Sequence, residues 1–197
     1  MERQVNIDDF NSYGARRGNH EIMVRGTFAN IRIKNQMVDD FGGYTKHYPT
    51  GNIGEIHKIA KMYESKDIPL IVVAGKEYGT GSSRDWAAKG TKLLGIKVVI
   101  AESFERIHRS NLIGMGILPL QFNDGTDRLN LKLKGSELIS INNIEKGFFP
   151  QDQVELEIKY LSGEIKKIKT LCRIDTNNEL EYYKNGGILQ YVLRKMI

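Results

Sequence analysis

Three short apolar segments alternate with segments of helical periodicity in the middle of the chain, and this alternation limits the folds that the chain can adopt. The apolar segments are residues 70–75, 97–102 and 117–122. Helices are expected between them, over about 83–94 and over 103–116. Strands that alternate with helices at this spacing pair in parallel through helical crossovers. The sequence therefore predicts an α/β fold with a partly parallel central sheet.

The rest of the chain predicts a further helix before this unit and a β-rich second half after it. Apolar residues at helical spacing indicate a helix over about 54–65: Ile56, Ile59, Ala60 and Tyr63. Alternation with polar residues indicates antiparallel strands around Leu129, Leu131 and Leu133 and around Val154, Leu156, Ile158 and Tyr160, with turns at Gly135 and Ser162-Gly163. The C-terminal stretch reads as a helix interrupted at Gly186-Gly187. No linker divides the chain, so we expect one domain with a central mixed sheet.

Composition excludes several classes of site. The 197 residues include 29 basic and 24 acidic side chains and one cysteine, Cys172. A single thiol forms no internal disulfide and holds no multi-cysteine zinc or iron–sulfur centre, so no metal site is expected in this chain. Because basic residues are interspersed with acidic ones, they indicate a solvated surface more than a nucleic-acid site. No apolar run approaches the roughly 20 residues of a membrane span, and the first ten residues lack a secretion signal. We therefore expect a cytoplasmic protein.

The glycine- and serine-rich segment Gly75–Asp85 is the most unusual local chemistry in the chain, and it fits none of three common motifs. A phosphate-binding P-loop needs a lysine before the serines. A dinucleotide fingerprint that starts at Gly79 needs glycine in place of Arg84, and a nucleophile elbow around Ser83 needs glycine in place of Asp85. The segment therefore belongs to none of these three classes.

Two serines and an arginine remain at the start of a predicted helix, just beyond the carboxyl end of a predicted strand. Unpaired amides and the positive end of the helix dipole favour a carboxylate or a phosphate there. Arg84 can add a two-pronged grip on such a group. A structural alternative is a capping box formed by Ser82 and Asp85. On these residues alone both interpretations stay open.

Five segments, in the same order, resemble the C-terminal swivel domain of the aconitase family. They are FNSYGARRGN at 10–19, RGTFANIRIKN at 25–35, YGTGSSRDWAAKG at 78–90, ERIHRSNLIGMGILPL at 105–120 and LCRIDTNNELEYYKNGGILQYVLR at 171–194. The resemblance covers essentially the whole chain and is to the larger, cytosolic-type aconitases, the branch that includes the iron-regulatory RNA-binding proteins. It implies a swivel-type β/β/α layered domain over residues 1–197.

The resemblance also implies an activity and a set of site residues. Aconitases interconvert citrate and isocitrate through cis-aconitate, so the chain is expected to be part of a hydro-lyase of the tricarboxylic acid cycle. Ser82 matches the serine that acts as catalytic base. Ser83 and Arg84 match contacts to the substrate carboxylates, and Arg3 matches a second substrate-binding arginine. Arginine suits this task because its planar fork holds a carboxylate in fixed geometry.

The same resemblance indicates what this chain does not carry. Aconitases bind citrate to a [4Fe-4S] cluster, and the cluster ligands lie in a part of the family's sequence that is not present here. The resemblance therefore implies an N-terminally truncated swivel domain, whose expected partners are a tricarboxylate substrate and the cluster-bearing domains of the same enzyme. We expect the isolated chain to have no aconitase activity.

Related proteins offer three alternative functions, two enzymatic and one non-enzymatic. The small subunit of isopropylmalate isomerase and the related methylisocitrate dehydratase have similar loops, but RGTFANIRIKN at 25–35 favours aconitase. Cluster-free members of this branch can bind messenger RNA. Arg32 matches an RNA-contacting arginine of those proteins, whereas the next such position is Gln36 here. RNA binding is therefore the non-enzymatic alternative.

Four further polar residues are interpreted as structural. His108 lies in a predicted helix and is expected to be a satisfied structural histidine, and Cys172 lies at the end of a predicted strand, outside any cluster motif. Arg16 and Arg17 are expected to pair with neighbouring domains.

Overall fold

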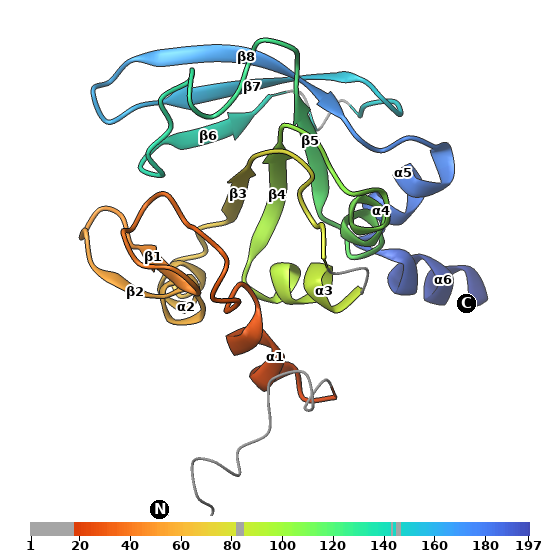
Figure 1. Cartoon of the computed structure of the whole chain (residues 1–197). Helices are drawn as coiled ribbons and strands as arrows, with labels where there is room; N and C mark the ends of the chain where they lie inside the picture. Colours follow the sequence, from red (N-terminus) through yellow and green to blue (C-terminus); the bar gives the residue numbers. More distant parts are fainter. Residues whose placement is uncertain (1–17, 82–84, 143, 145–146) are drawn as a thin grey trace, which may run out of the picture.

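A six-stranded mixed sheet is the centre of the fold (Figure 1). The computed structural model describes residues 18–81, 85–142, 144 and 147–197. The strands of the sheet, in spatial order, are β3 (Leu70–Ala74), β4 (Ile96–Ala101), β5 (Leu118–Phe122), β8 (Ile165–Cys172), β7 (Gln153–Lys159) and β6 (Leu138–Ile141). The helices are α1 (His20–Gly26), α2 (Ile56–Glu64), α3 (Asp85–Leu93), α4 (Arg106–Gly114), α5 (Asn177–Lys184) and α6 (Ile188–Met196).

The sheet has a parallel half and an antiparallel half. β3, β4 and β5 run parallel, with α3 and α4 as the crossovers between them. β8 pairs with β5 in the antiparallel sense, and β7 and β6 follow in the same sense. In Figure 1, β6, β7 and β8 lie across the top of the molecule at a steep angle to β3 and β4. The predicted α/β fold with a mixed, partly parallel sheet and a β-rich second half is confirmed.

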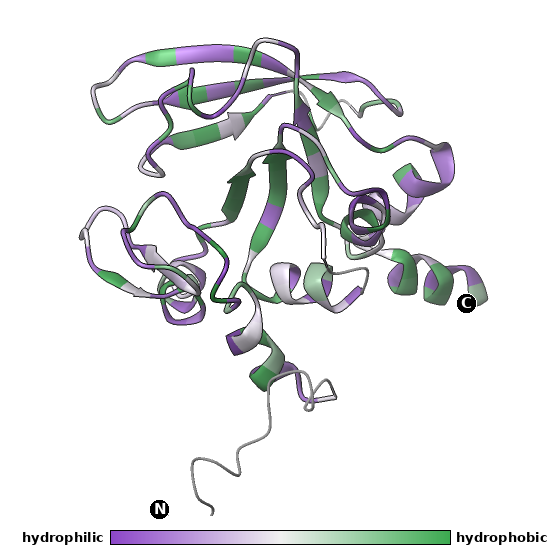
Figure 2. Cartoon of the chain, in the orientation of Figure 1, coloured by the Kyte–Doolittle hydropathy of each residue, from purple (hydrophilic) through white to green (hydrophobic). Residues whose placement is uncertain are grey.

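The core fills both faces of the sheet. On β4, Val98 and Ile100 join a cluster with residues of β5, β7 and α5, whereas Val99 and Ala101 join a second cluster with residues of α3 and α4. Successive side chains of a strand point to opposite faces, so a strand covered on both sides is apolar throughout. Figure 2 shows this as hydrophobic colour over most of β3 and β4. The burial explains why these strands stand out in the sequence as short, continuous apolar runs.

The N-terminal part adds a small unit beside the sheet. A two-stranded hairpin of β1 (Tyr44–Lys46) and β2 (Ile53–Glu55) leads into α2, and the helix predicted over about 54–65 is thereby confirmed. On the buried face of α2, Ile59 and Ala60 are 6% and 5% exposed. None of the described helices is long and apolar enough to cross a membrane.

One predicted strand is wrong. The alternation of Leu129, Leu131 and Leu133 predicts a strand, but the segment forms successive turns, and the edge strand β6 begins only at Leu138. The carboxylate of Asp127 accepts the amides of Leu129 and Asn130 at 2.7 and 2.8 Å, which closes a local turn. Short polar side chains that bond nearby amides compete in this way with a strand ladder. The predicted break in the C-terminal helix is confirmed by the separate helices α5 and α6.

Candidate active site

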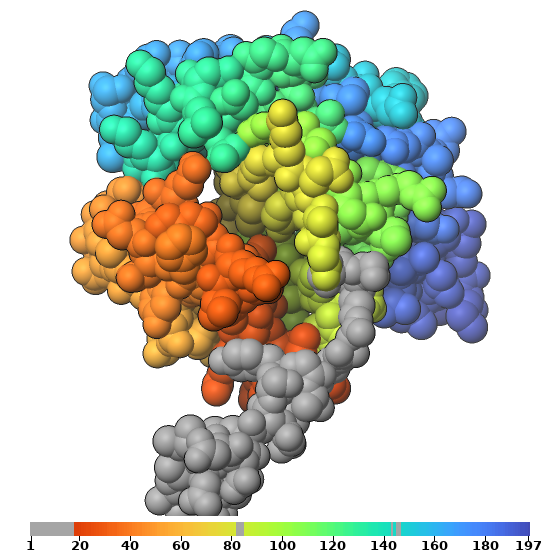
Figure 3. All heavy atoms as spheres, viewed as in Figure 1, coloured from red at the N-terminus to blue at the C-terminus, as the bar shows by residue number. Residues whose placement is uncertain are grey.

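The loop between β3 and α3 leaves the sheet at the carboxyl end of the parallel strands, where open α/β sheets bind small molecules. Residues 75–81 of this loop are described, and α3 begins at Asp85. Figure 3 shows these residues in yellow at the surface, beside a hollow that separates them from the orange segment between α1 and α2. Four predicted site residues lie outside the described residues: Arg3, Ser82, Ser83 and Arg84. Arg16 and Arg17 also lie outside them.

Backbone hydrogen bonds tie the first part of this loop to the segment that joins β4 to α4. The amide of Tyr78 donates to the carbonyl of Ser103 at 3.0 Å, and the amide of Glu105 donates to the carbonyl of Tyr78 at 3.0 Å. The amide of Glu77 donates to the Ser103 hydroxyl at 2.7 Å. Together these bonds extend the parallel pairing beyond the strands proper, through a bridge between Tyr78 and Phe104. The path of the loop up to Tyr78 is therefore defined by the neighbouring crossover.

Two glycines allow the turn that follows Tyr78. Gly79 has φ +100° and Gly81 has φ +93°, a conformation that residues with a side chain rarely adopt. A Cβ atom added at Gly79 would lie 2.3 Å from Cβ of His108, whereas one added at Gly81 would meet no atom within 4 Å. Gly79 therefore lies directly against His108, and Gly81 faces open space.

His108 is buried beneath the loop, at the start of α4. It is 2% exposed, and its ring meets the Tyr78 ring edge-on at 5.2 Å between centroids. Glu105 caps the helix: its carboxylate accepts the amides of Ile107 and His108 at 3.0 and 2.8 Å, and these bonds lower the pKa of Glu105. Burial lowers the pKa of His108, which the charge of Glu105 only partly opposes, so the imidazole is held neutral. The sequence predicts a satisfied histidine, but Nδ1 has no hydrogen-bond partner among the described residues.

Arg128, which no sequence motif indicates, lies at the other end of the loop. The Arg128 guanidinium is 2.5 Å from the carboxylate of Glu102, at the end of β4. A Cβ atom added at Gly75 would lie 3.0 Å from Nη1 of Arg128, so the guanidinium covers the first residue of the loop. The amide of Glu102 in turn donates to the carbonyl of Gly75 at 3.1 Å. Since Arg128 comes from the irregular segment after β5, no local pattern could have indicated this contact.

The remaining predicted residues lie apart from this loop. Arg32 is exposed in the segment between α1 and β1, and its amide donates to the Asn30 side chain at 2.9 Å. Gln36 is exposed on the same segment. A shallow pocket of about 200 Å³ lies between α1, the hairpin and α2, with Arg25 and His57 among its lining residues. None of the described loop residues 75–81 lines this pocket, so the candidate site rests on the loop itself.

The chain's own residues do not fit an iron–sulfur cluster. Cys172 is fully buried on β8, and burial raises the pKa of its thiol to about 11, so the thiolate that a metal needs is disfavoured. Across the described ranges, no group of three or more His, Cys, Asp or Glu side chains could hold a metal ion. The described residues of this chain therefore do not supply the ligands of a cluster.

Two features point to the class of protein: the mixed sheet, and the glycine- and serine-rich loop that leaves it at the carboxyl edge of the parallel strands. A family model described as the aconitase C-terminal domain matches residues 1–125. The chain therefore belongs to the aconitase C-terminal domain family, and the resemblance that the sequence motifs indicate is confirmed.

The relatives agree with this assignment over the whole chain. Aconitate hydratase A of Legionella pneumophila is 64% identical over 98% of this chain, and the protein of the same name from Escherichia coli is 56% identical over 99% of it. The chain spans 22% of the length of each of these relatives. Among solved structures, 3-isopropylmalate dehydratase of Methanocaldococcus jannaschii aligns with a TM-score of 0.45 and 24% identity, over 73% of this chain and 80% of that one.

Proposed function

We propose that this chain is the swivel domain of an aconitase that interconverts citrate and isocitrate through cis-aconitate. The supporting observation is the 64% identity to an aconitate hydratase A over nearly the entire chain. The location of the β3–α3 loop agrees with this role, since the loop reaches the surface at the carboxyl edge of parallel strands. In this proposal the chain works as one part of a longer cytoplasmic enzyme.

Ser82 is the proposed catalytic base, and it removes the proton next to a substrate carboxylate. A serine hydroxyl is a weak base at neutral pH, so its alkoxide needs stabilisation by amides at a helix start and by a nearby guanidinium. Ser83, Arg84 and Arg3 are the proposed contacts to the substrate carboxylates. A substrate with three carboxylates requires cations in fixed geometry, which arginine's fork supplies.

The proposed partners follow from the chemistry that this chain lacks. A [4Fe-4S] cluster, held by the part of the enzyme outside this chain, is the proposed cofactor, and Ser82 would meet the substrate only when that part is present. The isolated chain is therefore expected to show no turnover of citrate. Measurable turnover by the chain alone would contradict this division of roles.

Substitutions in the complete enzyme test the site. Ser82→Ala is expected to lower kcat by roughly 10²- to 10⁴-fold with little change in KM, as for loss of a general base. Arg84→Lys is expected to raise KM as well, because the forked contact is lost. Ser65→Ala is the matched control, since Ser65 is exposed at the end of α2. Normal turnover by Ser82→Ala would place the base elsewhere, and faster turnover of isopropylmalate or methylcitrate than of citrate would favour the related dehydratases.

RNA binding is the second candidate function, and the exposed position of Arg32 favours it. Among the described residues Arg32 forms no ion pair, so its guanidinium is available to a phosphate. Binding of a messenger RNA stem-loop by the cluster-free protein should weaken steeply with salt and should fall further in Arg32→Gln. No binding at low salt would end this candidate.

A further inference from the structure

His108 forms the surface against which the β3–α3 loop turns. The three atoms nearest to a Cβ added at Gly79 all belong to His108: Cβ, Cγ and Cδ2, at 2.3, 2.4 and 2.5 Å. Such distances leave no room for a side chain at residue 79. The backbone of the loop therefore rests on the imidazole itself, three residues before Ser82 in the sequence.

The surroundings of His108 hold the ring in one place. It is 2% exposed, and its ring packs against the Tyr78 ring. Its own amide donates to the carboxylate of Glu105, the cap of α4, at 2.8 Å. The next residue of the helix, Arg109, bonds to the carbonyl of Arg173 and to both carboxylate oxygens of Glu179, which fixes α4 against α5. A buried ring on an anchored helix is a rigid support, whereas the loop above it turns through left-handed glycines.

Among the described residues, the Nδ1 atom of His108 adds no hydrogen bond to this contact. Nδ1 is buried and has no hydrogen-bond partner among the described residues. A buried polar atom without a partner costs stability, so the hydrogen bonding of Nδ1 does not account for this residue. The shape of the ring accounts for it, because the ring fills the space below Gly79 and beside Tyr78.

We propose that His108 is a positioning residue, whose ring sets the path of residues 75–81, the described part of the loop that precedes Ser82 in the sequence. Its consequence for catalysis rests on the proposed function of Ser82. A displacement of about 1 Å in a catalytic group can cost on the order of 10² in rate. The ring acts by packing, so a ring without nitrogens should replace it.

Hydrogen exchange in the 197-residue chain tests the positioning without any enzyme assay. In His108→Ala, exchange of the Glu77 and Tyr78 amides should quicken by roughly tenfold or more, because their bonds to Ser103 lose the support below Gly79. Leu112→Ala is the matched control. Leu112 is fully buried on the same helix but is not among the atoms nearest to Gly79. His108→Phe should exchange like the parent chain.

A second pair of variants approaches the same contact from the loop. Gly79→Ala and Gly81→Ala share the strain of a positive φ, but only the first brings a Cβ against His108. Gly79→Ala should therefore speed exchange of the Tyr78 amide well beyond Gly81→Ala. Trp86 is the one tryptophan of the chain and the second residue of α3, directly after the loop. Its fluorescence should therefore shift in the same variants.

The catalytic consequence is measured in the complete enzyme. We expect His108→Ala to lower kcat by roughly 10- to 100-fold with KM changed less than about threefold, and His108→Phe to restore kcat to within about threefold. Equal exchange in His108→Ala and Leu112→Ala would overturn the proposal, as would a loosened loop with normal kcat or a failure of His108→Phe to rescue. If the unsubstituted enzyme does not turn over citrate, the proposed function fails, while the exchange comparison still decides whether His108 sets the loop.

Discussion

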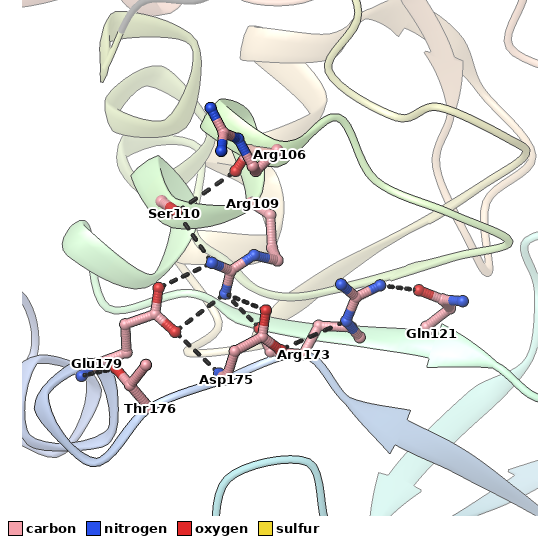
Figure 4. Close-up of polar contacts among 8 residues, drawn as sticks. All are labelled: Arg106, Arg109, Ser110, Gln121, Arg173, Asp175, Thr176 and Glu179. Carbon is pink, nitrogen blue, oxygen red and sulfur yellow. Dashed lines mark hydrogen bonds and ion pairs between the residues drawn. The ribbon is translucent and has the colours of Figure 1, made fainter.

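Arg109 is a buried arginine whose removal should cost several kilocalories per mole of stability. Figure 4 shows its guanidinium between α4 and the start of α5. It donates to both carboxylate oxygens of Glu179 at 2.8 and 3.0 Å and to the carbonyl of Arg173 at 2.7 Å. Asp175 adds a carboxylate at 3.5 Å. The side chains of Arg109 and Glu179 are 9% and 16% exposed, so water screens this pair only weakly.

The expected size of the effect follows from these contacts. Loss of one partner of a buried ion pair costs about 3–5 kcal/mol, because the other charge stays buried without compensation. Glu179 retains the amide of Asp175 at 2.8 Å, which favours the lower end of that range. Arg109→Met keeps the aliphatic part of the side chain, so we expect a loss of about 3 kcal/mol in the free energy of unfolding. For a domain of this size that lowers Tm by roughly 6–12 °C.

Urea unfolding of three variants and the parent chain measures the contribution of the pair. Arg109→Met/Glu179→Gln should recover to within about 1 kcal/mol of the parent, because the amide of Asp175 keeps its acceptor and no lone charge remains. Lys167→Met is the control. Lys167 pairs with Glu155 at 3.3 Å on the exposed face of β7 and β8, so its loss should cost about 0–1 kcal/mol. If Arg109→Met costs no more than Lys167→Met, the argument from burial is refuted.

The pH dependence of the same pair has a definite sign. Burial raises the pKa of Glu179, but the hydrogen bonds from Arg109 and from nearby amides lower it further, so the folded value lies below 4.5. The unfolded state therefore binds more protons between the two values, and the stabilisation is complete above about pH 4.5 and is lost as the pH falls through the folded pKa. In Arg109→Met this acid-dependent part of the stability should shrink.

Three further predictions concern other parts of the core. Cys172 should resist thiol reagents in the folded chain and react fully in denaturant, because it is completely buried and its thiol pKa is about 11; rapid labelling of the native chain would contradict this. Gly116→Ala should lower the free energy of unfolding by more than about 2 kcal/mol in urea, because Gly116 has φ +76° and its new Cβ would lie 2.6 Å from the backbone of Gly186. At Gly114 a new Cβ meets no atom within 4 Å, so Gly114→Ala should be neutral or stabilising. His108 has a pKa below 6.5, so its neutral form favours folding above that pH, and stability should fall as the pH drops toward the folded pKa; an unchanged pH dependence in His108→Phe would argue against a depressed pKa.

The continuous apolar strands β3 and β4 could be predicted from the sequence, and the irregular segment before β6 could not. The apolar residues of β4 belong to core clusters on both faces of the sheet, the partly buried residues of β3 pack against the same two clusters, and strands covered on both faces are apolar throughout. The residues around Leu131 have the alternation of a half-buried strand, yet Asp127 and Asn130 close turns there. Of the three leucines in this alternation, Leu131 is 3% exposed but Leu129 is 63% exposed, so a period of two predicted neither the backbone nor the full set of buried residues.

The candidate site divides in the same way. The loop 75–85 stands out in the sequence because its glycines, serines and arginine are adjacent, and the family motif gives them roles as proposals. Arg128 against Gly75 and His108 against Gly79 are contacts between residues 53 and 29 positions apart, and no local pattern contains them. These contacts form only in the folded chain, where the crossover places α4 and the segment after β5 beside the loop.

By itself, the sequence determined the α/β class, the parallel unit, the broken C-terminal helix and the aconitase family, because each depends on local periodicity or on contiguous motifs. Only the tertiary structure decided that β8 joins the parallel half at β5, that Arg109 holds α4 to α5, and that a buried imidazole lies under Gly79. Those features depend on side chains that meet across long stretches of chain. Packing and desolvation determine such contacts, and both depend on the whole fold.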